Sequence, residues 1–306
     1  MSTKHSVGVP DSAAPFLRGA DTDQPVYGRS NGIWWRASGS GDPLVLVQGL
    51  GYPAAMFHRL VPLLEPHCRV VVFDQRGIGN SAGANGLDSL TIGRMASDVV
   101  AVIDDAAGGS ADVMGVSLGG IVAQELALAY PRHVRRLVLA GTHTAGAEVV
   151  LAEQEVLEMM QRRSMLADEE ALRCSLPYVY APSTPKRLIE EDIAVRRAMH
   201  VGWDGYNAQL RATMQYSGTA ARLPRIQAET LVIHGELDRL VPPGNAVVIS
   251  ERIPGARLRI LPGLSHNFYS EAARTAAAEI LPFLTAPRSA HQHGPIELEH
   301  AGAKVA

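Results

Sequence analysis

The chain has 306 residues, 46% of them hydrophobic and 19% charged, with a formal net charge of −3. This composition can fill a sizeable core and excludes global disorder, and the absence of a Lys/Arg block gives no reason to expect nucleic acid or a membrane surface as a partner. No apolar run approaches the roughly 18 residues that cross a bilayer, and the N-terminus lacks the apolar core of a signal peptide. The two cysteines, Cys68 and Cys174, have neither disulfide-framework nor metal-site spacing, so we expect a cytoplasmic protein.

Residues 1–24 and 287–306 are predicted to be flexible arms. Both segments are rich in small and polar residues and show no hydrophobic period. The second arm carries three histidines for which no fixed geometry supports a metal site, so we interpret them as solvated. They are His291, His293 and His300.

Between the arms, short apolar segments rich in β-branched residues alternate with stretches of helical spacing. The apolar segments suit strands buried on both faces of a sheet, and they cover residues 44–47, 69–73, 111–116, 136–141, 230–235 and 256–261. The helical stretches include residues 91–107, 121–130 and 271–284. Strands that alternate with helices in this way predict a parallel sheet with helices on both faces.

The alternation is interrupted once, between residues 145 and 222. This segment contains three amphipathic helical stretches and no strand-like run. We interpret residues 145–222 as a helical cap that is inserted between two core strands and covers the sheet. Residues 25–144 and 223–286 then form the core.

Ser117 lies where a predicted strand turns directly into a predicted helix, in the sequence GVSLG. Such a sharp turn forces the corner residue into strained backbone, and only small neighbours such as Gly115 and Gly119 fit around it. The hydroxyl is thereby raised at the carboxyl end of the strand, near a helix amino end that favours developing negative charge. The pattern predicts a nucleophile elbow, although Ser117 also has the simpler interpretation of a turn serine.

A nucleophilic serine needs a base, and the base needs an acid to orient it, in the order Ser, Asp or Glu, His along this kind of fold. Asp238 follows the strand at 230–235, and His266 follows the strand at 256–261. Both should lie at strand carboxyl ends, where an open α/β sheet places its ligand crevice. Glu236 is the alternative orienting acid, and Asp238 and His266 have the simpler interpretations of a loop-capping and a surface residue.

The oxyanion that forms when a serine attacks a carbonyl group needs backbone donors. One donor is expected to be the N–H of Leu118, the residue that follows the serine. The other should come from the loop QGLG at 48–51. We assign it to the N–H of Leu50, with Gly51 as the alternative.

With these pieces in place, the chain resembles the α/β-hydrolase superfamily over nearly everything from about residue 25 to 285. The resemblance rests on five segments in the family's order: QGLG at 48–51, DQRGIGNS at 74–81, GVSLGG at 115–120, HGELDRLVPP at 234–243 and GLSHNF at 263–268. It implies an α/β-hydrolase fold, a mostly parallel doubly wound sheet with a helical cap after the sixth core strand. It also implies a Ser117 nucleophile, a His266 base, an Asp238 orienter and an acyl-enzyme intermediate. One departure is Gln48, because many relatives begin this loop with His-Gly.

Substrate contacts are expected near these motifs and in the cap, from Gln48, Gly49, Gly51, His143, Trp203 and Tyr206. The cap is rich in Met, Tyr and Trp, which suit an adaptable apolar pocket, although many of them must pack the cap on itself. His143 has the simpler interpretation of a loop histidine. Asp74 is interpreted as a turn residue and His234 as packed against its own loop.

The sequence therefore predicts a serine hydrolase that cleaves an ester, lactone or thioester of a medium-sized, largely apolar small molecule, without metal or organic cofactor. The alternatives are a C–C bond hydrolase of a ketone, a non-hydrolytic cyclase, lyase or perhydrolase on the same scaffold, and a ligand-sensing degenerate hydrolase. The oligomeric state stays open, with a homo-oligomer as one option.

Overall fold

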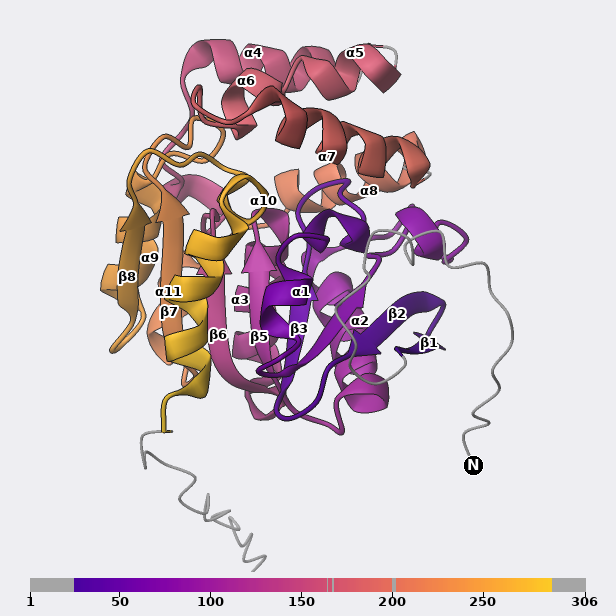
Figure 1. Ribbon diagram of the computed structural model, residues 1–306, viewed down its shortest axis with the longest axis vertical. Helices are drawn as coiled ribbons and strands as arrows, with labels where there is room; N and C mark the ends of the chain where they lie inside the picture. The colour runs from indigo at the N-terminus through magenta and orange to yellow at the C-terminus, as the bar shows by residue number, and fades with distance from the viewer. Residues whose placement is uncertain (1–24, 164, 167, 200–201, 288–306) are drawn as a thin grey trace, which may run out of the picture.

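The computed structural model describes residues 25–163, 165–166, 168–199 and 202–287. The arm predicted at 1–24 and all but the first residue of the arm predicted at 287–306, with His291, His293 and His300, lie outside the described residues. Within the described part, eight strands form one sheet that has helices on both sides (Figure 1).

The sheet is mixed, with its antiparallel pairs at one edge. In spatial order its strands are β1 (Val26–Ser30), β2 (Ile33–Ser38), β4 (Arg69–Phe73), β3 (Pro43–Val47), β5 (Ala111–Val116), β6 (Val134–Ala140), β7 (Glu229–Gly235) and β8 (Arg257–Leu261). β2 pairs antiparallel with β1 and β4, and all other neighbours are parallel. The six strands predicted from the sequence are confirmed as β3 to β8.

β1 and β2 form a hairpin that the sequence analysis did not predict. The turn between them is Asn31–Gly32, and both residues have positive φ, 52° and 83°. Asn-Gly is the preferred pair for a two-residue hairpin turn of this kind, because both central positions need positive φ. That dipeptide was the signal that would have revealed the hairpin.

Helices cover both faces of the sheet. They are α1 (Val61–Leu64), α2 (Ile92–Ala106), α3 (Leu118–Ala129), α9 (Gly244–Arg252), α10 (Phe268–Glu271) and α11 (Ala273–Thr285). Short 3-10 helices lie at η1 (Ala54–Phe57), η2 (Gly79–Ser81), η3 (Pro131–His133), η4 (Gly146–Glu148) and η5 (Ala220–Arg225).

The two faces of the sheet carry separate apolar clusters, as β3 illustrates. Val45 and Val47 belong to the cluster that contains residues of α2, α3 and α9, whereas Leu44 and Leu46 belong to the cluster with α1, α10 and α11. Successive side chains of a strand point to opposite faces, so the two clusters lie on opposite sides of the sheet. Burial on both sides explains why these strands read as continuous apolar runs.

Five helices are inserted between β6 and β7, within the segment predicted as the cap. They are α4 (Gln154–Arg163), α5 (Asp168–Arg173), α6 (Leu176–Val179), α7 (Lys186–Ala198) and α8 (Trp203–Met214). Figure 1 shows them at the top of the molecule, beyond the end of the sheet toward which the arrows of the central strands point. The exact boundaries between core and cap stay a prediction.

Helix α8 is seated directly on loops of the core. A Cβ on Gly205 would lie only 2.0 Å from the carbonyl oxygen of Gly77, so the two backbones touch. The side-chain oxygen Oε1 of Gln209 accepts a hydrogen bond of 3.0 Å from the N–H of Gly51. None of the helices in the described residues has the length and apolar character required to cross a membrane.

Candidate active site

Ser117 occupies a strained corner between β5 and α3. Its φ is 54°, one of few positive values outside glycine in the described residues. A Cβ on Gly115 would lie 2.2 Å from the carbonyl oxygen of Gly119, and a Cβ on Gly119 would lie 2.2 Å from that of Val47. The tight packing around the turn therefore requires glycine at both positions, and it holds the partly exposed serine at the amino end of α3.

The loops after β7 and β8 bring Asp238 and His266 together. Oδ2 of Asp238 lies 2.7 Å from Nδ1 of His266, and both side chains are buried. Ser117 and His266 line the same cavity. No hydrogen bond joins the Ser117 hydroxyl to His266 among the described residues, and such bonds are often long before a substrate binds.

Asp238 is fixed by its own loop and by a second histidine. Its Oδ1 accepts the N–H of Val241 at 2.8 Å, and Nε2 of His234 lies 3.1 Å from its Oδ2 and 2.8 Å from the carbonyl oxygen of Val241. Burial alone would raise the pKa of Asp238, but His266 and His234 outweigh it and hold that pKa below its usual value. The ionised carboxylate therefore accepts the Nδ1–H of His266, which leaves Nε2 free to take a proton.

The alternative acid, Glu236, is engaged elsewhere. Its Oε2 accepts the N–H of Gly263 at 2.9 Å, and it does not line the cavity. His234 contacts its own loop as predicted, and its contact with Asp238 is an addition that the sequence did not reveal.

A cavity of about 590 Å³ lies between the core and the inserted helices, and its wall is mostly apolar. Its volume falls in the range of small-molecule sites. Of the Met and aromatic residues of the cap, those on the wall are Met159, Met160, Tyr206, Met214 and Tyr216. The others pack elsewhere or face solvent, as Met199 does in the core and Met165 does at 76% exposure.

The backbone donors beside Ser117 differ in their availability. The N–H of Gly49 donates to Oε1 of Gln48 at 2.8 Å, and the N–H of Gly51 donates to Gln209. In the described part of the chain, the N–H groups of Leu50 and Leu118 have no acceptor. The loop also lies close to the serine, because a Cβ on Gly49 would be 3.1 Å from Cβ of Ser117. The N–H groups of Leu50 and Leu118 are therefore available to a ligand, whereas that of Gly51 is engaged by Gln209.

Gln48 is buried and stabilises this loop by hydrogen bonds. Its Nε2 donates to the hydroxyl of Tyr269 at 3.5 Å, and its carbonyl oxygen accepts Nε2 of Gln75 at 2.6 Å. Gln48 thus orders the loop through its own hydrogen bonds.

Four of the six predicted substrate contacts line the cavity, namely Gln48, Gly49, His143 and Tyr206. Gly51 does not, because Tyr206 covers it: a Cβ there would lie 2.6 Å from the tyrosine ring. Trp203 does not either, because it packs edge-on behind the Tyr206 ring, with 5.4 Å between the centroids. Gly51 and Trp203 were predicted as substrate contacts, and neither of them lines the cavity.

His143 reaches the cavity as a neutral side chain. Its Nδ1 accepts the N–H of Ala145 at 3.0 Å, which leaves the ring proton on Nε2. Burial, with the charges of His266 and His234 adding to it, lowers the pKa of His143 from 6.5 to about 4.

Asp74 has the structural role that the sequence suggested. Its Oδ1 accepts the N–H of Ala54 at 2.7 Å, and its Oδ2 accepts the N–H of Asn80 at 2.8 Å. The carboxylate therefore ties together two loops of the core.

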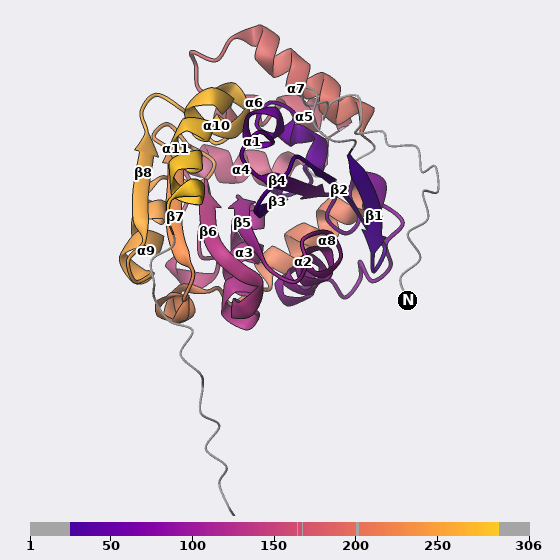
Figure 2. The ribbon, with the colours of Figure 1, turned by 60° about the horizontal axis from the view of Figure 1, so that its bottom comes forward.

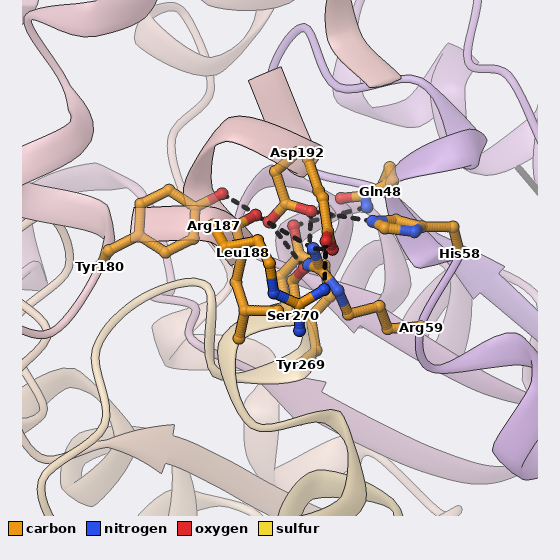
Figure 3. Close-up of polar contacts among 10 residues, drawn as sticks. Gln48, His58, Arg59, Tyr180, Arg187, Leu188, Asp192, Tyr269 and Ser270 are labelled. Atoms are coloured by element: carbon orange, nitrogen blue, oxygen red, sulfur yellow. Dashed lines mark hydrogen bonds and ion pairs between the residues drawn. The ribbon is translucent and has the colours of Figure 1, made fainter. Parts of the chain in front are cut away.

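A buried polar cluster joins the inserted helices to the core near the cavity. Figure 3 shows the side chains of Tyr180, His58 and Arg59 converging on Asp192 of α7. The Asp192 carboxylate accepts from Nη1 of Arg59 at 2.6 Å, from the Tyr180 hydroxyl at 2.7 Å and from the Ser270 hydroxyl at 2.7 Å, and it lies 2.8 Å from Nε2 of His58. Ser270 belongs to α10, which follows His266 in the chain. This Asp192 cluster therefore links α7 to the segment that carries the catalytic histidine candidate.

The cavity residues that the sequence analysis missed include Tyr52, Arg163 and Tyr269. Tyr52 and Tyr269 lie close in sequence to the QGLG and SHNF segments, and that proximity could have suggested them. Nothing in the local sequence of Arg163 indicates that it faces the cavity. Among the described residues, no group of three or more His, Cys, Asp or Glu is arranged to hold a metal ion.

Comparison with known proteins agrees with this geometry. A family model described as the alpha/beta hydrolase fold matches residues 42–273. A poly(3-hydroxyalkanoate) depolymerase of Ectopseudomonas oleovorans is 31% identical over 256 residues, which cover 80% of this chain and 85% of that protein. The chain therefore belongs to the α/β-hydrolase fold family.

Solved structures share the fold. The enol-lactonase from Burkholderia xenovorans LB400 has a TM-score of 0.74 at 24% identity and covers 85% of this chain and 100% of its own. A hydrolase from Pseudomonas aeruginosa PA01 has a TM-score of 0.72 at 27% identity, with coverage of 87% and 100%. Figure 2 shows, from a second viewpoint, the doubly covered sheet that defines this fold.

Proposed function

We propose that the protein is a serine hydrolase that cleaves ester, lactone or thioester bonds of medium-sized, largely apolar small molecules. The observation that carries the proposal is the Ser117 elbow on the wall of an apolar cavity, which also contains His266 bonded to the ionised Asp238. The family supports it as well, since one relative, 31% identical, is a poly(3-hydroxyalkanoate) depolymerase.

The reaction follows from the positions of these groups. Nε2 of His266 takes the proton of the Ser117 hydroxyl while Oγ attacks the carbonyl carbon, and the oxyanion accepts the N–H groups of Leu50 and Leu118. Asp238 holds the His266 ring and stabilises its cation. The carbon–oxygen or carbon–sulfur bond then breaks, and His266 returns the proton to the leaving group.

The second half of the reaction restores the serine. A water molecule gives a proton to His266 and attacks the acyl group on Ser117. The second tetrahedral intermediate uses the same two N–H donors. Its collapse releases the acid, and the proton on His266 returns to Ser117.

Hydrolysis of a p-nitrophenyl ester by Ser117→Ala tests the proposal. Removing the nucleophile should lower kcat at least about a thousandfold, since the rest of the site retains only part of its rate enhancement. Ser250→Ala is the matched control, because that hydroxyl lies on α9 and bonds to the carbonyl oxygen of Val247. Unchanged hydrolysis of the ester by Ser117→Ala would refute the serine mechanism.

A further inference from the structure

The cavity wall carries a single guanidinium. Among the described residues that line the cavity, Arg163 is the only Arg, Lys, Asp or Glu, and the rest are apolar or neutral polar side chains with the histidines His143 and His266. Arg163 is the last residue of α4 and is partly buried. A lone cation in a largely apolar cavity is unusual, because buried charges are ordinarily paired.

Arg163 makes two contacts, and neither partner is negatively charged. Its Nε donates to the carbonyl oxygen of Ala171 at 3.0 Å, and its guanidinium carbon lies 5.2 Å from the centroid of the Tyr206 ring. Within the described ranges, the two terminal nitrogens of Arg163 donate to no protein group. These contacts fix the orientation of the side chain and leave the bidentate edge of the guanidinium unused.

A second arginine makes this side of the cavity more positive. The guanidinium of Arg196 lies over the ring of Tyr52, at 4.3 Å from its centroid, and Tyr52 lines the cavity. Burial lowers the pKa of Arg196, and the charge of Arg163 adds to that lowering. Two like charges that affect one another make this side of the cavity more positive, and an anionic ligand would relieve their repulsion.

We infer that the substrate carries, in addition to the carbonyl group that Ser117 attacks, a carboxylate that binds Arg163 across the apolar cavity. This inference rests on the proposed hydrolase function and names its substrate class: esters in which an apolar chain separates the scissile bond from a terminal carboxylate. The planar guanidinium edge matches a carboxylate in a bidentate pair. A dianionic phosphate fits less well, because Arg163 lies at the carboxyl end of α4, where the helix dipole disfavours added negative charge.

A matched pair of substrates tests this inference. p-Nitrophenyl octanoate and the p-nitrophenyl half-ester of octanedioic acid differ only in a terminal carboxylate, and half-esters of hexanedioic and decanedioic acid vary the span. The wild-type protein should prefer a half-ester to the neutral ester of equal length. Arg163→Gln should raise KM for that half-ester about ten- to a hundredfold, with little change in kcat and little effect on the neutral ester.

Two variants distinguish a role of Arg163 in recognising the substrate carboxylate from a role in the folded structure. Arg163→Lys keeps the charge and should restore part of the preference, whereas Arg162→Gln removes the same charge from the exposed neighbour on α4 and should behave like the wild type. Equal losses for both esters in Arg163→Gln would assign Arg163 a structural role and overturn the inference. A wild-type preference for neutral esters at every length would also overturn it, while leaving the hydrolase proposal intact.

Failure of the proposed function gives a different result. In that case no ester is cleaved and Ser117 is not modified by a fluorophosphonate. Calorimetric binding of octanedioate to the wild type and to Arg163→Gln then still tests the anion site. Loss of binding in the variant supports the site, and equal or absent binding in both overturns it.

Discussion

At the scale of single residues, the proposed mechanism depends on the hydrogen bond between Asp238 and His266, which engages Nδ1 and leaves Nε2 for the serine. Asp238→Asn keeps the size of the side chain but replaces the ionised acceptor. It should lower kcat/KM on the order of a thousandfold, because an amide can hold the imidazole in the wrong tautomer and cannot stabilise its cation. Glu236→Gln is the matched control, since Glu236 bonds to Gly263 and does not line the cavity. If steady-state kinetics gave near-wild-type rates for Asp238→Asn, Asp238 would have no role in the mechanism.

His143 gives the folded protein a pH-dependent stability. Its pKa is about 4 in the folded state and 6.5 as the ordinary value, so the unfolded chain binds more protons between these two values. The free energy of unfolding should therefore decrease as the pH falls from 6.5 toward 4, by at most about 2 kcal/mol from this residue between pH 7 and pH 5.

His143→Asn tests this dependence, because asparagine can still accept the N–H of Ala145. Urea unfolding at the two pH values should show a smaller loss of stability in the variant than in the wild type. Equal losses would mean that His143 protonates without cost in the folded state.

How far the sequence predicts the site depends on where each residue lies. Ser117, Asp238 and His266 lie in the segments that follow core strands. The predicted strands therefore indicate where in the fold these residues lie. Trp203 and Arg163 lie in the cap, and their exposure to the cavity depends on how α4 and α8 rest on the core. That packing has no local signal, so Arg163 was missed and Trp203 was predicted as a substrate contact although it does not line the cavity.

At the scale of elements, the Asp192 cluster holds α7 against the core. Asp192 is 2% exposed and contacts Arg59, whereas Glu191, which is 41% exposed, contacts the same arginine from the surface. Asp192→Asn removes a buried carboxylate that accepts from Arg59, Tyr180 and Ser270, and it should cost about 3 kcal/mol in the free energy of unfolding. Glu191→Gln should cost less than about 1 kcal/mol. Equal effects in denaturant melts would show that burial does not set the strength of this contact.

The elements themselves were predictable where burial on both faces makes a continuous apolar run. β1 was missed because Gly28 and Arg29 interrupt it, and β1 lies at the edge of the sheet, where its first residues are exposed. The inserted segment was read as three helical stretches, and the structure divides it into five helices. α5 and α6 are too short to show a clear hydrophobic period.

At the scale of the whole molecule, the core supplies the proposed reacting groups and the inserted helices supply much of the cavity wall. Ser117, His266 and the loop at Leu50 belong to the core, whereas Met159, Arg163 and others come from the insertion. This division predicts that changes in α4 and α8 alter substrate preference more than the chemical step.

The central claim is that Ser117 is an activated nucleophile. Intact-mass analysis after incubation with a small fluorophosphonate tests it most directly, on the wild type, Ser117→Ala and His266→Ala. The account predicts a single covalent adduct on the wild type, none on Ser117→Ala, and strongly slowed labelling of His266→Ala, because the base activates the serine. A folded wild-type protein that forms no adduct, or an adduct that persists in Ser117→Ala, would contradict the account.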